Sequence, residues 1–295
     1  MLKHFILLLV FTFTTLPAST LSLLILGSGG PEMGDQRASS AYIVKVDGRS
    51  RVLIDFGGGA SLRFEEAGVH IEELDVILLT HLHIDHTADL PALMKASFFT
   101  PRSRDLELFG PEGNRVMPGT RTFIKRLFEN RDGAWQYMGD YLDGRAAFRL
   151  RAKDVRKSRK VHTIYRKGDL SIQAVSVHHG PIPAMAYRVN VGKKSITFSG
   201  DMNGKYHTLE RLAKNTDLLL AHNAVPKGAG GPAADLHMTP YTIGQIASKA
   251  NAGTLILSHR MLRTLGRESE TKKEIRKSYK GKTAFADDKS LYNVR

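Results

Sequence analysis

Apolar runs of strand length alternate with amphipathic stretches along most of the chain. Residues 21–27 (LSLLILG) enter a glycine turn, and residues 41–56 hold two strand-like stretches around Asp47-Gly48, a pair typical of a hairpin. Further apolar runs predict strands at 74–80, 106–110, 170–177, 195–200, 217–221 and 253–258. Amphipathic stretches predict helices at 60–68, 119–130, 207–214, 239–250 and 267–279. This alternation is typical of α/β folds in which helices cover sheets.

Length and composition indicate one large α/β domain, which we place at residues 21–295. The chain has 295 residues, of which 42% are hydrophobic, so a sizeable core can be buried. We find no linker and no internal repeat. The segment 131–168 is rich in Gly, Arg and Lys, and we expect it to be an insertion or a mobile loop.

The first twenty residues differ from the rest and predict a signal peptide, residues 1–20. Lys3 and His4 precede the apolar run FILLLVFTFTTL, and small residues follow it. A retained anchor is disfavoured because the run is shorter than the roughly 20 residues of a spanning helix. The sequence contains no cysteine and no second run of spanning length. We therefore expect a periplasmic or secreted protein with no stable membrane span after cleavage.

The formal net charge is +14, which favours acidic partners. Much of the positive charge lies in two segments, residues 149–167 and 260–282. These segments are suited either to phosphate-bearing ligands and nucleic acid or to a solvated surface. Aromatic side chains for base stacking are sparse in both, so we favour the solvated surface. Arg260 has two interpretations, contact with an anionic substrate or a structural ion pair.

Predicted strands end repeatedly at histidine or aspartate. His81, the pair His178-His179, Asp201, His222 and His259 each follow such a run. Ligands of α/β sheets gather at the carboxyl ends of strands, so five such ends predict one shared cleft. The glycine turn in GSGGPEMG, from residue 27, is expected to line this cleft rather than to bind a nucleotide.

The stretch LLTHLHIDHTADL places four ligand-type side chains within six positions: His81, His83, Asp85 and His86. Alternate residues of an extended segment face the same way, so His81 and His83 can reach one metal ion, while Asp85 and His86 begin a helix and face a second. Four residues cannot complete two coordination shells, and the strand-end candidates for the remainder are His179, Asp201 and His259. Because adjacent strand residues face opposite sides, only one of His178 and His179 should be a ligand. We choose His179, which Gly180 follows.

The motif His81-Leu82-His83-Ile84-Asp85-His86 resembles the HxHxDH signature of metallo-β-lactamase-fold hydrolases. HHGPIPAMAYRV, FSGD, LHMTPYTIGQ and LILSH are similar, in order, to segments of the ribonuclease Z branch. The resemblance implies a four-layer αββα sandwich with two metal ions at one edge. It assigns His81, His83 and His179 to the first ion. It assigns Asp85, His86 and His259 to the second, and it makes Asp201 the bridge.

The resemblance also implies supporting and catalytic roles. Asp55 and His222 would support the ligands from outside the coordination shells. His237 would be the catalytic histidine that protonates the leaving group or stabilises charge, and Asp85 would serve in catalysis as well as in metal binding. A plain structural role, as a turn residue for Asp55 and as a helix cap or loop residue for His237, is the alternative.

Three features depart from the family patterns. Asn223 follows His222 where ribonuclease Z has a glutamate that supports the catalytic histidine. Only 22 positions separate His179 from Asp201, which leaves no room for the tRNA-gripping arm of that family. The absence of cysteine removes the thiolate ligand of the common zinc β-lactamases. We therefore do not expect maturation of tRNA.

The predicted function is that of an exported, binuclear, metal-dependent hydrolase. Two divalent ions, with Zn²⁺ expected and Mn²⁺ or Fe²⁺ compatible, would supply a bridging hydroxide. The expected substrate is a small anionic ester such as a phosphodiester, with nucleic acid not favoured. Hydrolysis of a lactone, a β-lactam or a sulfate ester is one alternative. A non-catalytic metal- or nucleic-acid-binding protein is another. A homodimer is compatible with the sequence.

Overall fold

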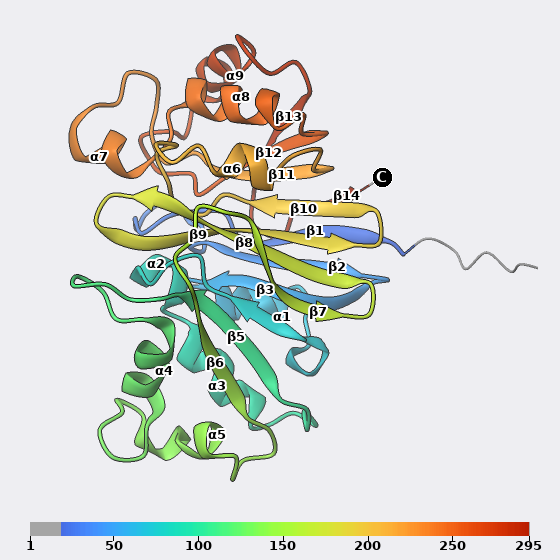
Figure 1. The fold of residues 1–295 in the computed structure, drawn as a ribbon, viewed down its shortest axis with the longest axis vertical. Helices are drawn as coiled ribbons and strands as arrows, with labels where there is room; N and C mark the ends of the chain where they lie inside the picture. The colour runs from blue at the N-terminus through green and yellow to red at the C-terminus, as the bar shows by residue number, and fades with distance from the viewer. Residues whose placement is uncertain (1–18, 295) are drawn as a thin grey trace, which may run out of the picture.

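Two mixed sheets stack face to face, and helices cover the outer face of each (Figure 1). The computed structural model describes residues 19–294. The first sheet has the order β14-β1-β2-β3-β4-β5-β6, from Leu291–Val294, Leu21–Gly27, Ala41–Val46, Arg49–Phe56, Val76–Leu78, Leu106–Pro111 and Leu150–Val155. The second has the order β13-β12-β11-β10-β9-β8-β7, from Lys282–Phe285, Thr254–Ser258, Leu218–His222, Lys194–Phe198, Ile182–Val191, Leu170–His179 and His162–Lys167.

Helices on the outside of the first sheet come from the first half of the chain: α1 (Ala60–Glu66), η1 (Ile71–Glu73), α3 (Leu90–Ser97), α4 (Thr120–Phe128), η2 (Gln136–Met138) and α5 (Asp140–Asp143). Helices on the outside of the second sheet are α6 (Leu209–Leu212), α8 (Pro240–Lys249) and α9 (Glu268–Ile275). The short helices α2 (Ile84–Thr87) and α7 (Gly231–Leu236) lie at one edge of the sandwich. The predicted αββα architecture is confirmed.

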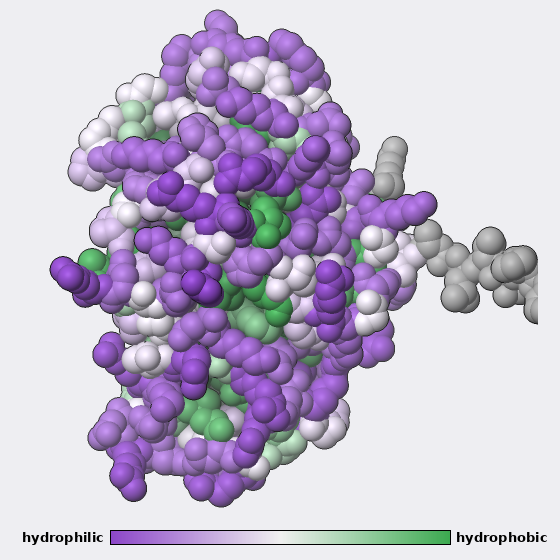
Figure 2. Space-filling view, viewed as in Figure 1, coloured by the Kyte–Doolittle hydropathy of each residue, from purple (hydrophilic) through white to green (hydrophobic). Residues whose placement is uncertain are grey.

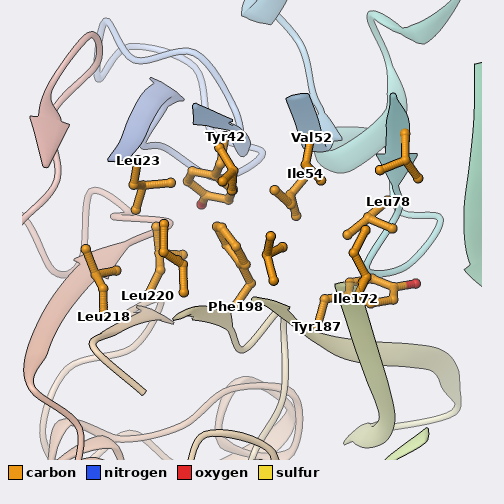
Figure 3. Close-up of a cluster of buried hydrophobic side chains, with 14 of the residues drawn as sticks. Leu23, Tyr42, Val52, Ile54, Leu78, Ile172, Tyr187, Phe198, Leu218 and Leu220 are labelled. Atoms are coloured by element: carbon orange, nitrogen blue, oxygen red, sulfur yellow. The ribbon is translucent and has the colours of Figure 1, made fainter. Parts of the chain in front are cut away.

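The central core lies between the two sheets, where alternate side chains of facing strands meet (Figure 3). Tyr42 and Ile54 of the first sheet point toward Phe198, Tyr187 and Leu220 of the second. The rings of Tyr42 and Phe198 lie 5.9 Å apart between centroids, and both side chains are essentially inaccessible to solvent. Burial of this apolar surface holds the two halves of the chain together.

The prediction of a mobile loop at residues 131–168 is wrong. That segment contains η2, α5 and the strands β6 and β7, which form the outer edges of the two sheets. Only Leu150 and Val155 of β6 are fully buried, and basic side chains occupy much of the rest. The apolar alternation that marks a strand is therefore weak, because each edge strand has one neighbour and a largely solvated surface.

Other elements also differ from the prediction. The strand β9 was not predicted, since prolines at 181 and 183 interrupt its beginning, and neither were β13 and β14. The last helix ends at Ile275 rather than at residue 279. The hairpin at Asp47-Gly48 is confirmed, because both residues have positive φ and β2 pairs with β3 across them.

A buried carboxylate, Asp75, links the two sheets on the side away from the predicted cleft. Arg51 and Arg104 pair with it, and Lys167 Nζ of β7 lies 2.7 Å from its Oδ1. Burial raises the pKa of Asp75, but hydrogen bonds from the three cations outweigh burial and hold that pKa below its usual value. The ionised carboxylate is therefore the form that stabilises the fold.

Among residues 19–294, no helix is both long and apolar enough to cross a membrane. The predicted signal peptide falls almost entirely on residues 1–18, which lie outside the described part of the chain.

Candidate metal centre

The predicted site residues come together at the edge of the sandwich where the central strands end. His81 and His83 follow β4, and Asp85 and His86 lie in α2. His179 ends β8, and the residues from the other strand ends and loops of the second sheet are Asp201, His222, His237 and His259. Except for His83 and His237, which retain some exposure, these side chains are buried. The shared cleft predicted from the strand ends is therefore present.

His81, His83 and His179 form the first group of nitrogen donors. The Nε2 atom of His81 lies 3.0 Å from Nδ1 of His83, and Nε2 of His179 lies 3.3 Å from the same atom. Asp201 completes this group, whose donor atoms all lie within 4.8 Å of one another. Three neutral imidazoles cannot all donate hydrogen bonds to each other at such short range, whereas all three can direct lone pairs at one cation.

The second group of possible donors consists of His86, His222, His259 and the same Asp201, and Asp85 lies beside two of its histidines. Asp85 Oδ2 lies 3.4 Å from His86 Nε2 and 3.1 Å from His259 Nε2. His86 Nε2 is buried and has no hydrogen-bond partner among the described residues. A buried nitrogen without a partner is costly unless a ligand satisfies it. A metal ion would satisfy it here.

Asp201 lies where the two groups meet. Its Oδ2 is 3.8 Å from Nε2 of His81, of His86 and of His179, and 3.5 Å from Nε2 of His259. Donor atoms about 2.1 Å from a tetrahedral ion lie about 3.4 Å apart, so these separations fit shared coordination better than hydrogen bonding. The donor set thus fits two divalent cations with Asp201 between them.

Asp55 holds His86 in place from the side away from the site. Its Oδ2 lies 2.7 Å from Nδ1 of His86. The same carboxylate accepts hydrogen bonds from the Thr80 backbone N–H at 2.7 Å and the Thr80 hydroxyl at 2.8 Å. With its proton on Nδ1, a metal-bound His86 would present the Nε2 lone pair to the site. This is the arrangement by which outer carboxylates orient metal-binding histidines.

His222 contacts Asp201 differently from the other histidines. Its Nδ1 lies 2.7 Å from Asp201 Oδ1, a hydrogen-bonding distance, and its Nε2 lies 3.1 Å from the Tyr42 hydroxyl. Tyr42 in turn donates a hydrogen bond to Ser258 Oγ at 3.0 Å. His222 is also near enough to His86 and His259 to be counted among the possible donors. The short contact favours the predicted role of supporting Asp201.

His237 lies at the mouth of the centre, just before α8. Its Nδ1 is 3.7 Å from Asp201 Oδ2, and its ring faces those of His179 and His259 at 5.4 and 5.7 Å between centroids. The side chain keeps 11% of its surface exposed. The side chain of Thr239 caps α8, so His237 does not cap that helix, but His237 ends α7, where its backbone N–H donates to Ala233 O. His237 therefore lies against the donor groups while keeping part of its side chain in contact with solvent.

Comparison with known proteins agrees with this geometry. Residues 34–243 match the family model described as the metallo-beta-lactamase superfamily. The chain belongs to that superfamily. It is 26% identical to ribonuclease Z of Mycobacterium avium (strain 104) over 281 residues, which cover 90% of this chain and 95% of the relative. The prediction of a metal-dependent hydrolase similar to the ribonuclease Z branch is confirmed.

Two solved members of the fold superpose over most of the chain. The metallo-beta-lactamase fold protein YhfI from Bacillus subtilis gives a TM-score of 0.73 at 21% identity and covers 93% of this chain and 99% of its own. The short form of human tRNase Z gives a TM-score of 0.72 at 19% identity, with the same coverages. At these identities the likeness concerns the fold.

Charge and burial act in opposite directions on the histidines of this superfamily member. Burial lowers the pKa of His86 and His259, but nearby carboxylates outweigh it and raise the pKa of both above its usual value. Burial lowers the pKa of His81 and His179, so both are neutral, as metal binding requires. Burial also lowers the pKa of His222 to about 4 and that of His237 to about 3. Burial raises the pKa of Asp201, but the charges of the surrounding histidines outweigh it and hold the pKa well below its usual value.

The turn at residues 27–34 lines the superfamily site as predicted. A Cβ atom on Gly30 would lie 2.7 Å from Cε1 of His259, so only glycine leaves room for that ring. His178 faces away and packs its ring at 5.0 Å from that of Tyr206, which agrees with the choice of His179. Arg260 pairs with Glu268 and Asp287, which supports the ion-pair interpretation over contact with substrate.

Sequence reasoning missed two residues that organise the centre of this superfamily member. Thr80 lies within the quoted motif, yet nothing in its type indicates that its backbone and hydroxyl both bind Asp55. Tyr42 lies 180 positions from His222, with which it shares a contact. The tyrosine within the mainly apolar stretch AYIVKV was the available signal.

Proposed function

We propose that the chain is a binuclear metal-dependent hydrolase of phosphodiesters or similar anionic esters. The observation that supports it is the meeting of two donor groups at one oxygen of Asp201. The likeness to ribonuclease Z, an enzyme named for cleaving a phosphodiester polymer, favours phosphodiesters over lactones, β-lactams and sulfate esters. Zn²⁺ is the proposed metal, because the donors are nitrogen and carboxylate oxygen.

The residues of the metal centre would have distinct roles in hydrolysis. Two cations held by these donors would supply hydroxide near neutral pH and stabilise the anionic oxygens of the transition state. His81, His83 and His179 would hold one cation, and His86, His259 and Asp85 the other. Asp55 and His222 orient their partners through the 2.7 Å contacts described above.

His237 is the proposed catalytic histidine. Support for this role comes from its Nδ1, which lies 3.7 Å from Asp201 Oδ2 and has no hydrogen-bond partner among the described residues. There, as a neutral imidazole whose pKa is lowered to about 3, it would donate a hydrogen bond to the oxygen that departs. Exchange of His237 for alanine should leave metal content intact and lower kcat by about 100-fold, the usual size of the contribution of one hydrogen-bond donor to the transition state. Unchanged turnover would return the residue to a structural role.

The test of the proposed function is a panel of substrates given to the purified chain with added zinc or manganese. We expect metal-dependent hydrolysis of an aryl phosphodiester and little turnover of an aryl sulfate or a lactone. Asp201→Ala should lose bound metal and activity together, because both donor groups lose their shared oxygen. Turnover of only the sulfate or the lactone would contradict the proposed substrate class.

We also propose that the chain is exported to the periplasm or secreted. The support comes from the sequence, in which a basic start, an apolar run and small residues precede the first strand. Expression of the full chain with a C-terminal tag, followed by cell fractionation and N-terminal sequencing, tests this. We expect a product that begins near residue 21 outside the cytoplasm. An intact cytoplasmic chain would contradict it.

A further inference from the structure

Four cations gather in five residues at the edge of the sandwich, in the connection between β6 and β7. Residues 156–160 read RKSRK, and we call this segment the cationic loop. All four of its Arg and Lys side chains are exposed, and none pairs with a carboxylate within 4 Å among the described residues. By contrast, Arg151 in the preceding strand is paired with Asp105, just before β5, and Lys153 is paired with Glu107 of β5. The loop therefore carries uncompensated positive charge.

The backbone of the cationic loop is fixed against the strand that carries His179. Ser158 N–H donates to Ser176 Oγ at 2.9 Å, and Ser176 N–H donates to Ser158 O at 2.8 Å. The N–H of Lys157 donates to Glu112 Oε1 at 2.8 Å, so this nearby acid is bound to backbone. Ser176 precedes His179 by three strand residues, which corresponds to about 10 Å. The backbone of the cationic loop is therefore held beside the strand that supplies His179, three residues before that histidine.

A cavity of about 250 Å³ fills the space between the cationic loop and the hairpin that follows His179. Lys157 and Tyr206 line it on the side of the loop, and Gly180, Pro181 and Ile182 line it on the side of the hairpin. The guanidinium of Arg159 lies 3.9 Å from the centre of the Tyr206 ring. Polar side chains also line the cavity, among them Glu112, whose Oε1 accepts from the Lys157 N–H. A partly apolar cavity with a cation and an aromatic ring at its border suits a flat ring attached to phosphate.

The surroundings favour a charged polymer over a membrane. The large exposed apolar side chains of the described chain include none from residues 149–167. The face crossed by β6 and β7 is mainly hydrophilic (Figure 2). Arg211 adds a further cation, since its guanidinium donates to the backbone oxygen of Arg159 at 2.9 Å. A bilayer surface would be expected to meet exposed apolar anchors here.

We propose that the cationic loop and the adjoining cavity bind a single strand of nucleic acid whose scissile phosphodiester lies in the metal centre. The loop holds phosphates, and the cavity accepts one base. The inference rests on the proposed phosphodiesterase function, because that function gives the binding site its role. Binding itself can be measured without hydrolysis. The proposed substrate is then a phosphodiester linkage within a nucleic-acid strand rather than a small ester.

The test compares two triple variants of the full mature chain with the parent protein. The first, Arg156→Gln/Lys157→Gln/Lys160→Gln, removes three charges from the cationic loop. The control, Lys273→Gln/Arg276→Gln/Lys282→Gln, removes three exposed and unpaired charges near α9, at the far end of the second sheet. Thermal unfolding verifies that both variants fold.

The probe is a labelled single-stranded DNA oligonucleotide with phosphorothioate linkages, followed by fluorescence anisotropy across a salt series. For single strands, each phosphate contact contributes about 0.7 to the slope of log K against log salt, so losing three should lower the slope by about 2. We expect binding to weaken at least tenfold at low salt in the loop variant and to stay near the parent value in the control.

Equal binding by the two variants would overturn the proposal, and so would binding to anionic phospholipid vesicles without binding to the oligonucleotide. The proposed function has a separate readout, the metal-dependent turnover of a small aryl phosphodiester. Loss of oligonucleotide affinity in the loop variant supports the strand-binding site whether or not that small ester is hydrolysed. Failure of the hydrolytic function and failure of the binding site are thereby distinguished.

Discussion

Replacement of Asp55 by asparagine should weaken the second metal site without disturbing the fold around it. The change is nearly isosteric, and the amide oxygen can still accept from the Thr80 backbone N–H. The amide nitrogen, however, would face Nδ1 of His86, which now lies 2.7 Å from a carboxylate oxygen. Two donors would then oppose each other. The proton of His86 would have to move to Nε2, the nitrogen directed at the metal.

The size of the effect follows from the bond that is lost. A hydrogen bond to a charged group contributes about 1.5–3 kcal/mol, which equals roughly 10- to 150-fold in an equilibrium constant. Loss of an outer carboxylate partner costs about 10- to 100-fold in metal affinity in comparable sites. Both estimates predict a 10- to 100-fold loss for the ion at His86, Asp85 and His259. The ion at His81, His83 and His179 should be affected less.

The assay is competition for zinc between the protein and a chromophoric chelator, which resolves two affinities if two ions bind. Asp89→Asn serves as the control, because Asp89 accepts hydrogen bonds from Ser61 and contacts no histidine of the centre. Equal zinc affinities in Asp55→Asn and in the parent chain would refute the assigned tautomer of His86. A loss at both sites alike would refute the separation into two groups.

Two further predictions concern packing and charge. Gly30→Ala should push the His259 ring aside, because the new Cβ would lie 2.7 Å from its Cε1, and should lower zinc occupancy at the second site. Gly230→Ala is the control, since a Cβ there meets nothing within 4 Å. Equal zinc content of the two variants by elemental analysis would contradict this prediction. Asp75→Asn should lower the free energy of unfolding by about 3 kcal/mol at neutral pH, at the low end for a broken buried ion pair because Lys167 is half exposed. Because the pKa of Asp75 is lowered in the folded state, its contribution is present above about pH 4 and is lost as pH falls through the folded value. Urea unfolding should therefore show the two proteins converging in acid, and a constant difference down to pH 2 would argue against the assigned charge.

The sequence was sufficient to predict that the candidate ligand side chains come together, because they lie at or just after the ends of strongly apolar strands. His81, His179, His222 and His259 each follow a run that reads as a buried strand, and such ends share one edge of a sheet. The αββα layers follow from the same runs and the helices between them. Local sequence patterns therefore identified the side chains that the fold brings together.

The misses have a physical cause as well. The edge strands β6 and β7 bury few side chains, so hydrophobic periodicity could not reveal them. The contact of Tyr42 with His222, and that of Thr80 with Asp55, depend on how strands pack rather than on local sequence. Pairing across 180 positions leaves no trace in a single sequence. Substrate preference likewise depends on loops, whose conformations are set by tertiary contacts and so cannot be predicted from local sequence.

The position of Asp201 between residues from both sheets has a consequence for the lifetime of the protein. His81 and His86 lie just after β4 of the first sheet, whereas His179 ends β8 and His259 follows β12 of the second sheet. Cations at this centre would therefore join the two halves of the chain. An ion that binds only the docked halves adds about 2.7 kcal/mol of stability when present at a hundred times its dissociation constant. A shortage of the metal would then shorten the survival of the folded chain as well as slow its turnover.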